Sequence, residues 1–137
     1  ITRYIAVDGE KKEQIADSCA EMFANNGVII KNAPVLMVLT YIKGRSGYER
    51  DGSFTTSKGD RWQMFDAGIA SQGFCLAAYE QGLGSVILGI FDDAKVASIL
   101  EIPENQEVAA LIAVGYPDEE PAAPKRKPVA DLLSFIH

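Results

Sequence analysis

The sequence predicts one globular domain in which strands and helices alternate. Its 137 residues are 47% hydrophobic and 23% charged, an ordinary balance for a folded protein, and a chain of this length buries enough surface to fold without disulfides or a structural metal. Two strongly apolar runs, 35–41 and 107–115, have the length of buried strands. Because helical patterns separate the strands, the order of elements by itself favours a parallel, doubly wound sheet.

The N-terminal segment contains a predicted strand and a predicted helix. Thr2 to Val7 alternates with β-branched and aromatic residues, and Asp8-Gly9 ends this strand. Over residues 10–23 the apolar side chains recur on one helical face, which makes Cys19 a predicted core residue. The sequence Asn25-Asn26-Gly27 predicts the end of this helix.

The middle of the chain holds the predicted sheet centre and the longest helix. The run Val35 to Tyr41 is too uniformly apolar for a half-exposed strand, so we expect it to be buried on both faces. Residues 43–59 contain four glycines and no sustained periodicity, which predicts a long loop that is either functional or mobile. A helix is predicted over 60–81, and small residues beside its apolar stripe would let another backbone approach closely.

The C-terminal third contains two predicted strands around one helix. A short buried strand is expected at Ser85 to Leu88, followed by a helix that Asp92 or Asp93 caps and that ends at Leu100. The second strongly apolar strand comes next. The tail after Pro117 is rich in proline, and its apolar residues 129–136 fit a short terminal helix.

Charge and composition exclude several classes of function. A net charge of −6 argues against general binding to nucleic acids or anionic membranes. The only histidine is His137, and Cys19 and Cys75 lack metal-type spacing, so we expect neither a metal site nor a histidine-based triad. The apolar runs are shorter than a bilayer crossing, and two thiols on apolar helical faces fit a reducing compartment. We therefore expect a cytoplasmic protein without nucleic-acid or membrane partners.

Three local signals have competing interpretations. Gly82-Leu83-Gly84 has the glycines of a phosphate loop, but here a helix leads into a strand, so a turn is favoured. The basic cluster 125–127 is either a solvated charge run, which the sequence alone favours, or a local site for an anionic group. The aromatic residues on the long helix, Trp62, Phe65 and Phe74, fit a core or an interface better than a ring-binding platform.

Several short motifs occur in a recognisable order and spacing from Pro34 onwards. They are Asn-Ala-Pro-Val-Leu at 32–36, Asp-Ala-Gly-Ile-Ala-Ser-Gln at 66–72, Gly-Leu-Gly-Ser at 82–85, Leu-Gly-Ile-Phe at 88–91, Ile-Pro at 102–103, Leu-Ile-Ala-Val-Gly-Tyr-Pro at 111–117 and Arg-Lys-Pro at 126–128. With these motifs the sequence resembles the nitroreductase family. Its members are flavin mononucleotide (FMN) enzymes that reduce nitroaromatics, quinones and related small acceptors with NADH or NADPH.

The resemblance implies a fold and an assembly that differ from the parallel default. It implies an α+β fold, with a mixed, mostly antiparallel sheet flanked by helices, and an intertwined homodimer with two flavin sites at its interface. The helix over 60–81 would be the central dimer helix. Residues 1–137 would form a single domain that is incomplete at its N-terminus, because the family's Arg-Arg-Ser-x-Arg and Asn-x-Gln-Pro-Trp segments do not occur in the sequence.

The resemblance also implies which residues bind the cofactor. Ile87, Leu88 and Gly89 match the segment beside the reactive edge of the flavin ring, where a backbone amide can hydrogen-bond the flavin N5 atom. Arg126 matches the family's C-terminal phosphate-binding residue, and Lys125 is a weaker match. No catalytic side chain and no metal are implied, since the flavin carries the chemistry.

These observations give three functional hypotheses. The first is an FMN-dependent oxidoreductase that passes hydride from NADH or NADPH through the flavin to a small acceptor. The second is a flavin or nucleotide binding protein of the same fold without turnover, which the two absent N-terminal segments motivate. The third is a structural dimerisation module built on the helix over 60–81.

Overall fold

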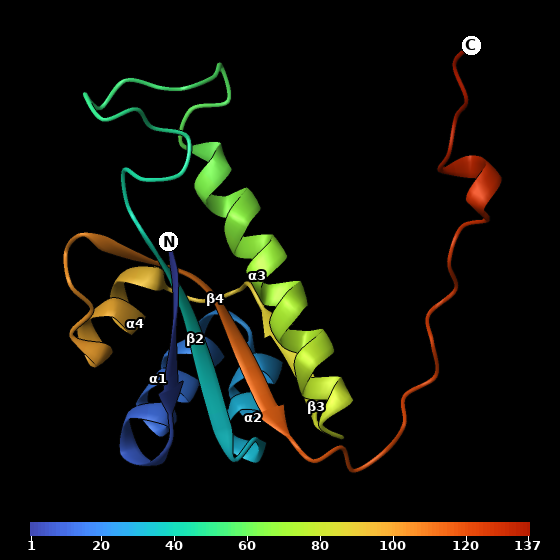
Figure 1. The fold of residues 1–137 in the computed structure, drawn as a ribbon. Coiled ribbons are helices and arrows are strands. Elements are labelled where there is room, and N and C mark those ends of the chain that lie inside the picture. The colour runs from blue at the N-terminus through green and yellow to red at the C-terminus, as the bar shows by residue number, and fades with distance from the viewer.

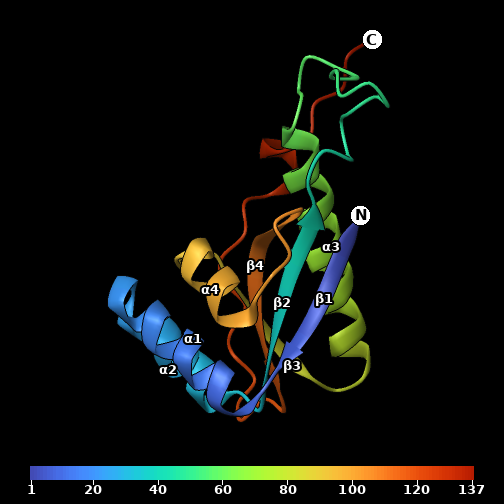
Figure 2. The same cartoon turned by 90° about the vertical axis from the view of Figure 1, so that its left-hand side faces the viewer.

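A computed structural model that describes residues 1–137 consists of one four-stranded sheet between two helical layers. Helices α1, α2 and α4 cover one face of the sheet and α3 covers the other (Figures 1 and 2). The elements in chain order are β1 (Thr2–Val7), α1 (Gly9–Met22), α2 (Ala24–Asn32), β2 (Val35–Ile42), α3 (Arg61–Glu80), β3 (Gly84–Leu88), α4 (Asp93–Leu100) and β4 (Gln106–Gly115). None of the helices has the length and apolar character that crossing a membrane requires.

The strands lie in the order β1-β2-β4-β3, and every neighbouring pair is antiparallel. The parallel sheet that alternation favours is therefore wrong, and the α+β fold with a mostly antiparallel sheet is confirmed. Two helices, α1 and α2, join β1 to β2 as a hairpin, so the chain returns to the end of the sheet that it left. Val7, the last residue of β1, accordingly pairs with Leu36 near the start of β2. Strand β4 then inserts between β2 and β3, antiparallel to both.

Helix α2 was not predicted, because its first residues look like a helix stop. Asn25, Asn26 and Gly27 lie inside α2, and only Phe23 separates this helix from α1. A Cβ atom at Gly27 would lie 2.8 Å from the carbonyl oxygen of Ala16 and 2.7 Å from the Cβ of Ala20. The glycine is therefore required for the close approach of two helices, a role that its sequence neighbourhood does not reveal.

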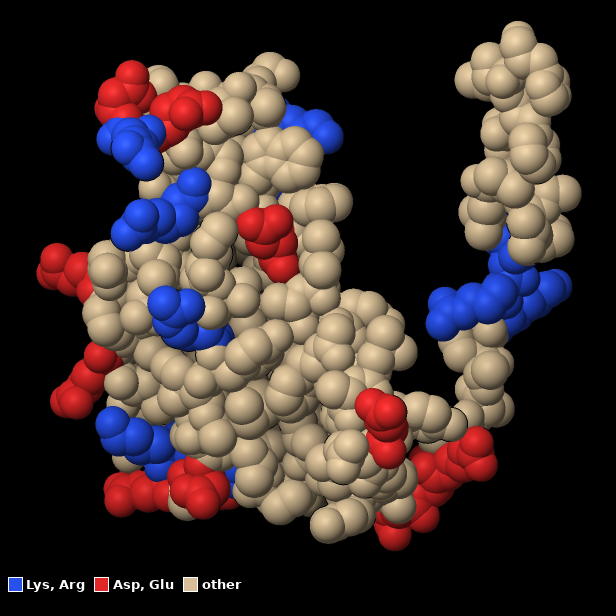
Figure 3. Space-filling view, viewed as in Figure 1, with Lys and Arg blue, Asp and Glu red and all other residues tan.

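Other predictions hold or fail for local reasons. Strand β2 lies inside the sheet as expected, and Asp92 caps α4 by accepting a hydrogen bond from the Lys95 N–H at 2.9 Å. The prediction that β3 is a buried strand is wrong. Strand β3 forms an edge of the sheet, and Val86 and Ile87 are each 46% exposed. The expected terminal helix is a single 3-10 turn, Val129–Asp131, in an extended tail that leaves the body of the protein (Figure 3).

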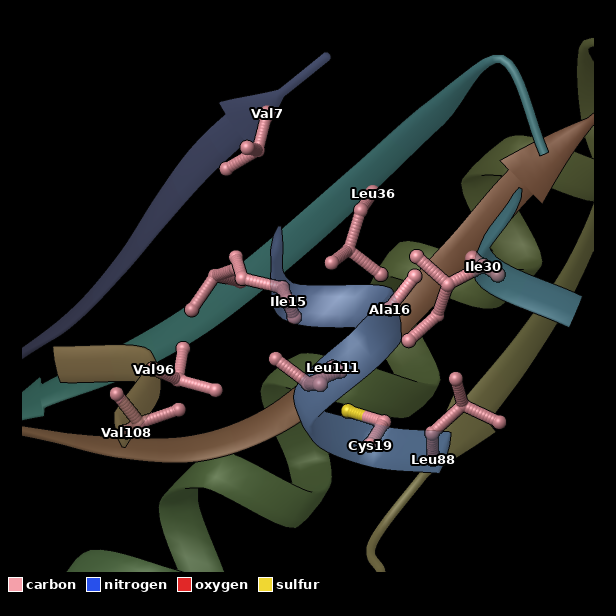
Figure 4. Packing of buried hydrophobic residues seen from close by; sticks show 12 residues of the cluster. Val7, Ile15, Ala16, Cys19, Ile30, Leu36, Leu88, Val96, Val108 and Leu111 are labelled. Carbon is pink, nitrogen blue, oxygen red and sulfur yellow. The ribbon is translucent and has the colours of Figure 1, made fainter. Parts of the chain in front are cut away.

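Buried apolar residues lie on both faces of the sheet, in two clusters of unequal size. The larger cluster fills the space between the sheet and α1, α2 and α4, where Ile15, Cys19 and Leu111 are fully buried (Figure 4). A smaller cluster of Leu39, Tyr41 and Ala67 lies beneath α3. Helix α3 packs mainly against the sheet, so its opposite face is open to solvent.

Candidate functional site

The segment Ile87 to Gly89 lies where the edge strand β3 ends. Leu88 pairs with Leu111 and is buried in the same cluster as Cys19 (Figure 4). Successive side chains of a strand point to opposite faces, and Ile87 is 46% exposed. The strand thus anchors one side chain in the core and presents its neighbour at the surface.

The backbone that follows β3 has free hydrogen-bond donors. The N–H groups of Gly89 and Ile90 donate no hydrogen bond to backbone or side chain. A Cβ atom at Gly89 would meet nothing within 4 Å, and the Ile90 side chain is 49% exposed. Unpaired amides beside apolar side chains form a surface to which a flat ring with an acceptor atom on its edge can bind. The family resemblance implies a role for Gly89 but not for Ile90, whose free N–H is not evident from its apolar side chain.

Lys125 and Arg126 lie on the extended tail, exposed and without an ion pair. Figure 3 shows this basic cluster standing apart from the body of the protein, so the structure does not bring it together with Gly89 within one chain. The first part of the tail contacts β3, since Gly84 and Pro117 border the same cavity.

That cavity has a volume of about 680 Å³ and lies between the end of α3, the start of β3 and the base of the tail. Its lining includes Cys75, Tyr79 and three consecutive carboxylates, Asp118 to Glu120. The carboxylates disfavour a phosphate here, because like charges repel. The exposed cations nearest in the chain to these carboxylates are those of the basic cluster further along the tail.

The outer face of α3 forms a shallow apolar groove of about 620 Å³. Its floor contains Gly68 and Gly73, and a Cβ atom at either glycine would meet nothing within 4 Å. Exposed apolar side chains line it, namely Met64, Phe65, Ile69 and Leu76. Of the small residues predicted to let another backbone approach, Gly68 lies in this groove, whereas Ala67 and Ser71 are buried. Phe65 belongs to an exposed face in the single chain.

Few ionisable groups have the properties of catalytic residues. Burial raises the pKa of the Cys19 thiol, so this thiol stays protonated and unreactive. Burial, and then a hydrogen bond to the Glu107 carboxylate, raise the pKa of the Tyr41 phenol. No three histidine, cysteine or acidic side chains lie together as a metal site would require. Backbone donors, apolar surface and exposed cations are therefore the groups that could hold a cofactor.

Comparison with known proteins identifies the family. A model of the nitroreductase family matches residues 7–116, which is most of the chain. The chain belongs to the nitroreductase family. The matched residues include β3, the segment that follows it and the whole of α3.

Two relatives of this nitroreductase-family chain are named as flavin or nicotinamide enzymes. The NADPH-flavin oxidoreductase of Vibrio harveyi is 29% identical over 129 residues, which cover 88% of this chain and 50% of the relative. The NADPH-dependent oxidoreductase of Staphylococcus haemolyticus is 31% identical over 139 residues, which cover 95% of this chain and 51% of the relative. The chain thus spans about half the length of these two oxidoreductases.

Solved structures of the nitroreductase family have the same fold. A nitroreductase family protein from Streptococcus pneumoniae superimposes with a TM-score of 0.82 at 22% identity, covering 98% of this chain and 78% of that one. An FMN-dependent nitroreductase from Clostridium difficile superimposes with a TM-score of 0.67 at 28% identity, covering 90% of this chain and 68% of that one.

Proposed function

We propose that the protein is an FMN-dependent NAD(P)H oxidoreductase that acts as a homodimer. The observation that carries this proposal is the pair of free N–H groups at Gly89 and Ile90, set beside the exposed side chains of Ile87 and Ile90. The names of the Vibrio and Clostridium relatives support the choice of flavin as the ligand.

The chemistry of the segment after β3 supports flavin as its ligand. Ile87 and Ile90 offer apolar surface to a ring face and would exclude water from it. The amide of Gly89 offers a donor to a ring nitrogen without a side chain in the way. When bound, FMN supplies the hydride chemistry, so this chain has to orient the ring and needs no acid or base of its own.

Arg126, with Lys125 as the weaker candidate, would hold the FMN phosphate. Arginine presents a planar fork of donors that matches phosphate oxygens. In a chain of net charge −6, the cluster that includes these residues is a strong local attraction for an anion. Because the tail carries them away from Gly89 of their own chain, we place their phosphate contact in a flavin site shared with a second copy.

The open face of α3 and the apolar end of the tail support the homodimer. The groove lined by Ile69 and Leu76 is an exposed apolar surface that a second copy could cover. The tail ends in exposed apolar side chains, of which Ile136 is 96% exposed. A second copy packed on α3 would cover both surfaces, as the tail could then lie along its partner.

The electron acceptor in this proposal is a nitroaromatic, a quinone or a similar small molecule. The names of nicotinamide-dependent relatives support NADH or NADPH as the donor. Two free cysteines fit a reducing compartment, and on this ground we propose the cytoplasm as the location.

A visible absorption spectrum of the purified full-length protein tests the proposal. We expect a flavin band, present on purification or after addition of FMN, that bleaches when NADH or NADPH is added without oxygen. Addition of menadione or a nitroaromatic should then restore the band as the acceptor takes the hydride.

Two other outcomes would decide between the remaining hypotheses. A flavin band that neither nicotinamide bleaches would indicate a binding protein without turnover. A protein that stays colourless with excess FMN, while still forming a dimer, would leave the structural dimerisation module as its function.

A further inference from the structure

The side chain of Asn26, on α2, holds the backbone of the segment that follows β3. Its Nδ2 donates a hydrogen bond to the carbonyl oxygen of Ile90 at 3.0 Å, although the two residues are 64 positions apart. This is the only hydrogen bond that residues 89–91 make, since none of their other backbone groups donates or accepts one. Asn26 is 6% exposed, so water has little access to compete for its amide.

Asn26 is itself held in place by its surroundings. Its own N–H donates to the carbonyl oxygen of Phe23 at 2.9 Å. The next residue is Gly27, whose missing side chain lets α2 pack directly on α1. Because α2 is packed closely on α1, the Asn26 side chain is a firm support for the backbone that it contacts.

The ends of the segment are anchored by apolar side chains, and its middle is not. Leu88 is buried in the core, and Phe91 packs against the same cluster. Between them, Gly89 has no side chain and the Ile90 side chain lies half in solvent. The orientation of the peptide groups at Gly89 and Ile90 therefore depends on Asn26.

We propose that Asn26 is a positioning residue for the flavin site, which fixes the backbone after β3 so that its free N–H groups face the ring. This inference rests on the proposed function. Asn26 does not touch the ring in this account, because it acts through the Ile90 carbonyl. Without it, the segment samples more conformations, and binding has to order them at a cost in affinity.

Replacing Asn26 should also change the reduction potential of bound FMN. The N5 atom of oxidised flavin accepts a hydrogen bond, whereas reduced flavin carries a hydrogen at N5. Poorer placement of a donor amide therefore weakens binding of the oxidised form more than binding of the reduced form. The midpoint potential should become more positive when Asn26 is replaced.

Two substitutions with matched controls test the inference on the full-length protein. Asn26→Ala removes the side chain, and Asn26→Leu keeps a branched side chain of similar size but cannot donate a hydrogen bond. Asn25→Ala and Asn25→Leu make the same changes at the exposed neighbour on α2, whose side chain makes no hydrogen bond. The measurements are the FMN dissociation constant by fluorescence titration, the midpoint potential of bound FMN, and the circular dichroism spectrum.

We expect both Asn26 variants to bind FMN about fivefold to tenfold more weakly, the fold-change that corresponds to loss of one hydrogen bond. Their midpoint potentials should be more positive, and their circular dichroism spectra should match the wild type. If Asn26→Ala does not fold, Asn26→Leu decides the question, because leucine has a branched side chain of similar size and carries no charge.

The result that overturns the inference is a dissociation constant and a potential in the Asn26 variants equal to those of the Asn25 controls, in proteins that bind FMN. A wild type that binds no FMN would overturn the proposed function, and this inference with it. The two failures are distinguished by the wild-type titration alone.

Discussion

The ammonium group of Lys12, on α1, donates a hydrogen bond of 2.6 Å to the carbonyl oxygen of Ala33, just past the end of α2. A second, longer contact of 3.3 Å joins the same group to the carbonyl oxygen of Lys31. The last carbonyls of a helix lack partners within the helix. A buried cation on α1 therefore completes the end of α2 and closes the hairpin that carries Asn26.

We expect Lys12→Met to lower the free energy of unfolding by about 1.5 to 3 kcal/mol, the cost of losing a hydrogen bond to a charged group. Methionine keeps most of the buried stem, so the loss reports on the ammonium group. Urea denaturation at neutral pH measures it. Lys11→Met, at the exposed neighbour, should stay within about 0.5 kcal/mol of the wild type. Equal midpoints for the two variants would contradict the prediction.

The elements that sequence analysis predicted are those with local signals. Strands β2 and β4 are long apolar runs, and α3 has a sustained helical period and ends where Gly82 takes a positive φ of 76°. The Asp92 side chain caps α4 by accepting a hydrogen bond from the N–H of Lys95, three residues later in the chain. Each of these features depends on residues that are close in the chain.

The features that could not be predicted depend on contacts between distant residues. Gly27 lies in a helix because it faces Ala16 and Ala20 on α1, which propensity does not show. The bond from Asn26 to Ile90 spans 64 residues. The antiparallel sheet was predicted from the family resemblance and not from the order of elements. The roles of Lys125 and Arg126 stay predictions, because one chain does not bring them near Gly89.

Tyr41 and Glu107 lie opposite each other on β2 and β4, and the Tyr41 hydroxyl donates a hydrogen bond to the Glu107 carboxylate. Burial, followed by this carboxylate, raises the pKa of the Tyr41 phenol above its ordinary value near 10. The protonated phenol therefore stabilises the fold fully below about pH 10, and this stabilisation is lost as the pH rises above that value.

We expect Tyr41→Phe to be less stable than the wild type by about 1 to 2 kcal/mol at pH 8. The difference should shrink between pH 10 and 11, by up to about 1.4 kcal/mol, because only the wild-type unfolded state gains from ionising this tyrosine. Guanidinium denaturation at pH 8 and 11 measures both values. Tyr116→Phe, at a fully exposed position in the tail, serves as the control. A difference that does not change with pH would refute this assignment.

The outer face of α3 should control the oligomeric state. Ile69 is 59% exposed in the apolar groove, and Ile69→Asp would place a charge where a second copy is proposed to pack. We expect this variant to be monomeric at a protein concentration at which the wild type is a dimer, as measured by light scattering. Val28→Asp makes the same kind of change at a 54% exposed side chain on α2 and should leave the dimer intact. If the Ile69→Asp protein is still a dimer, the dimer interface does not lie on the outer face of α3.

Arg126 should contribute to binding of the FMN phosphate and not to binding of the flavin ring. We expect Arg126→Ala to bind FMN roughly 10- to 100-fold more weakly, the loss expected for a charge-assisted hydrogen bond. Lys125→Ala should have a smaller effect, since this residue is the weaker candidate. Fluorescence titration measures both dissociation constants.

Titration with riboflavin separates a phosphate contact from a general loss of binding. Riboflavin has the same ring as FMN and no phosphate, so Arg126→Ala should bind it as the wild type does. Lys11→Ala removes a cation of the same charge from α1, far from the tail, and should bind both ligands normally. If Arg126→Ala lost affinity for riboflavin as well, the tail would act on the ring or on the fold, and the phosphate would have to be held by other residues.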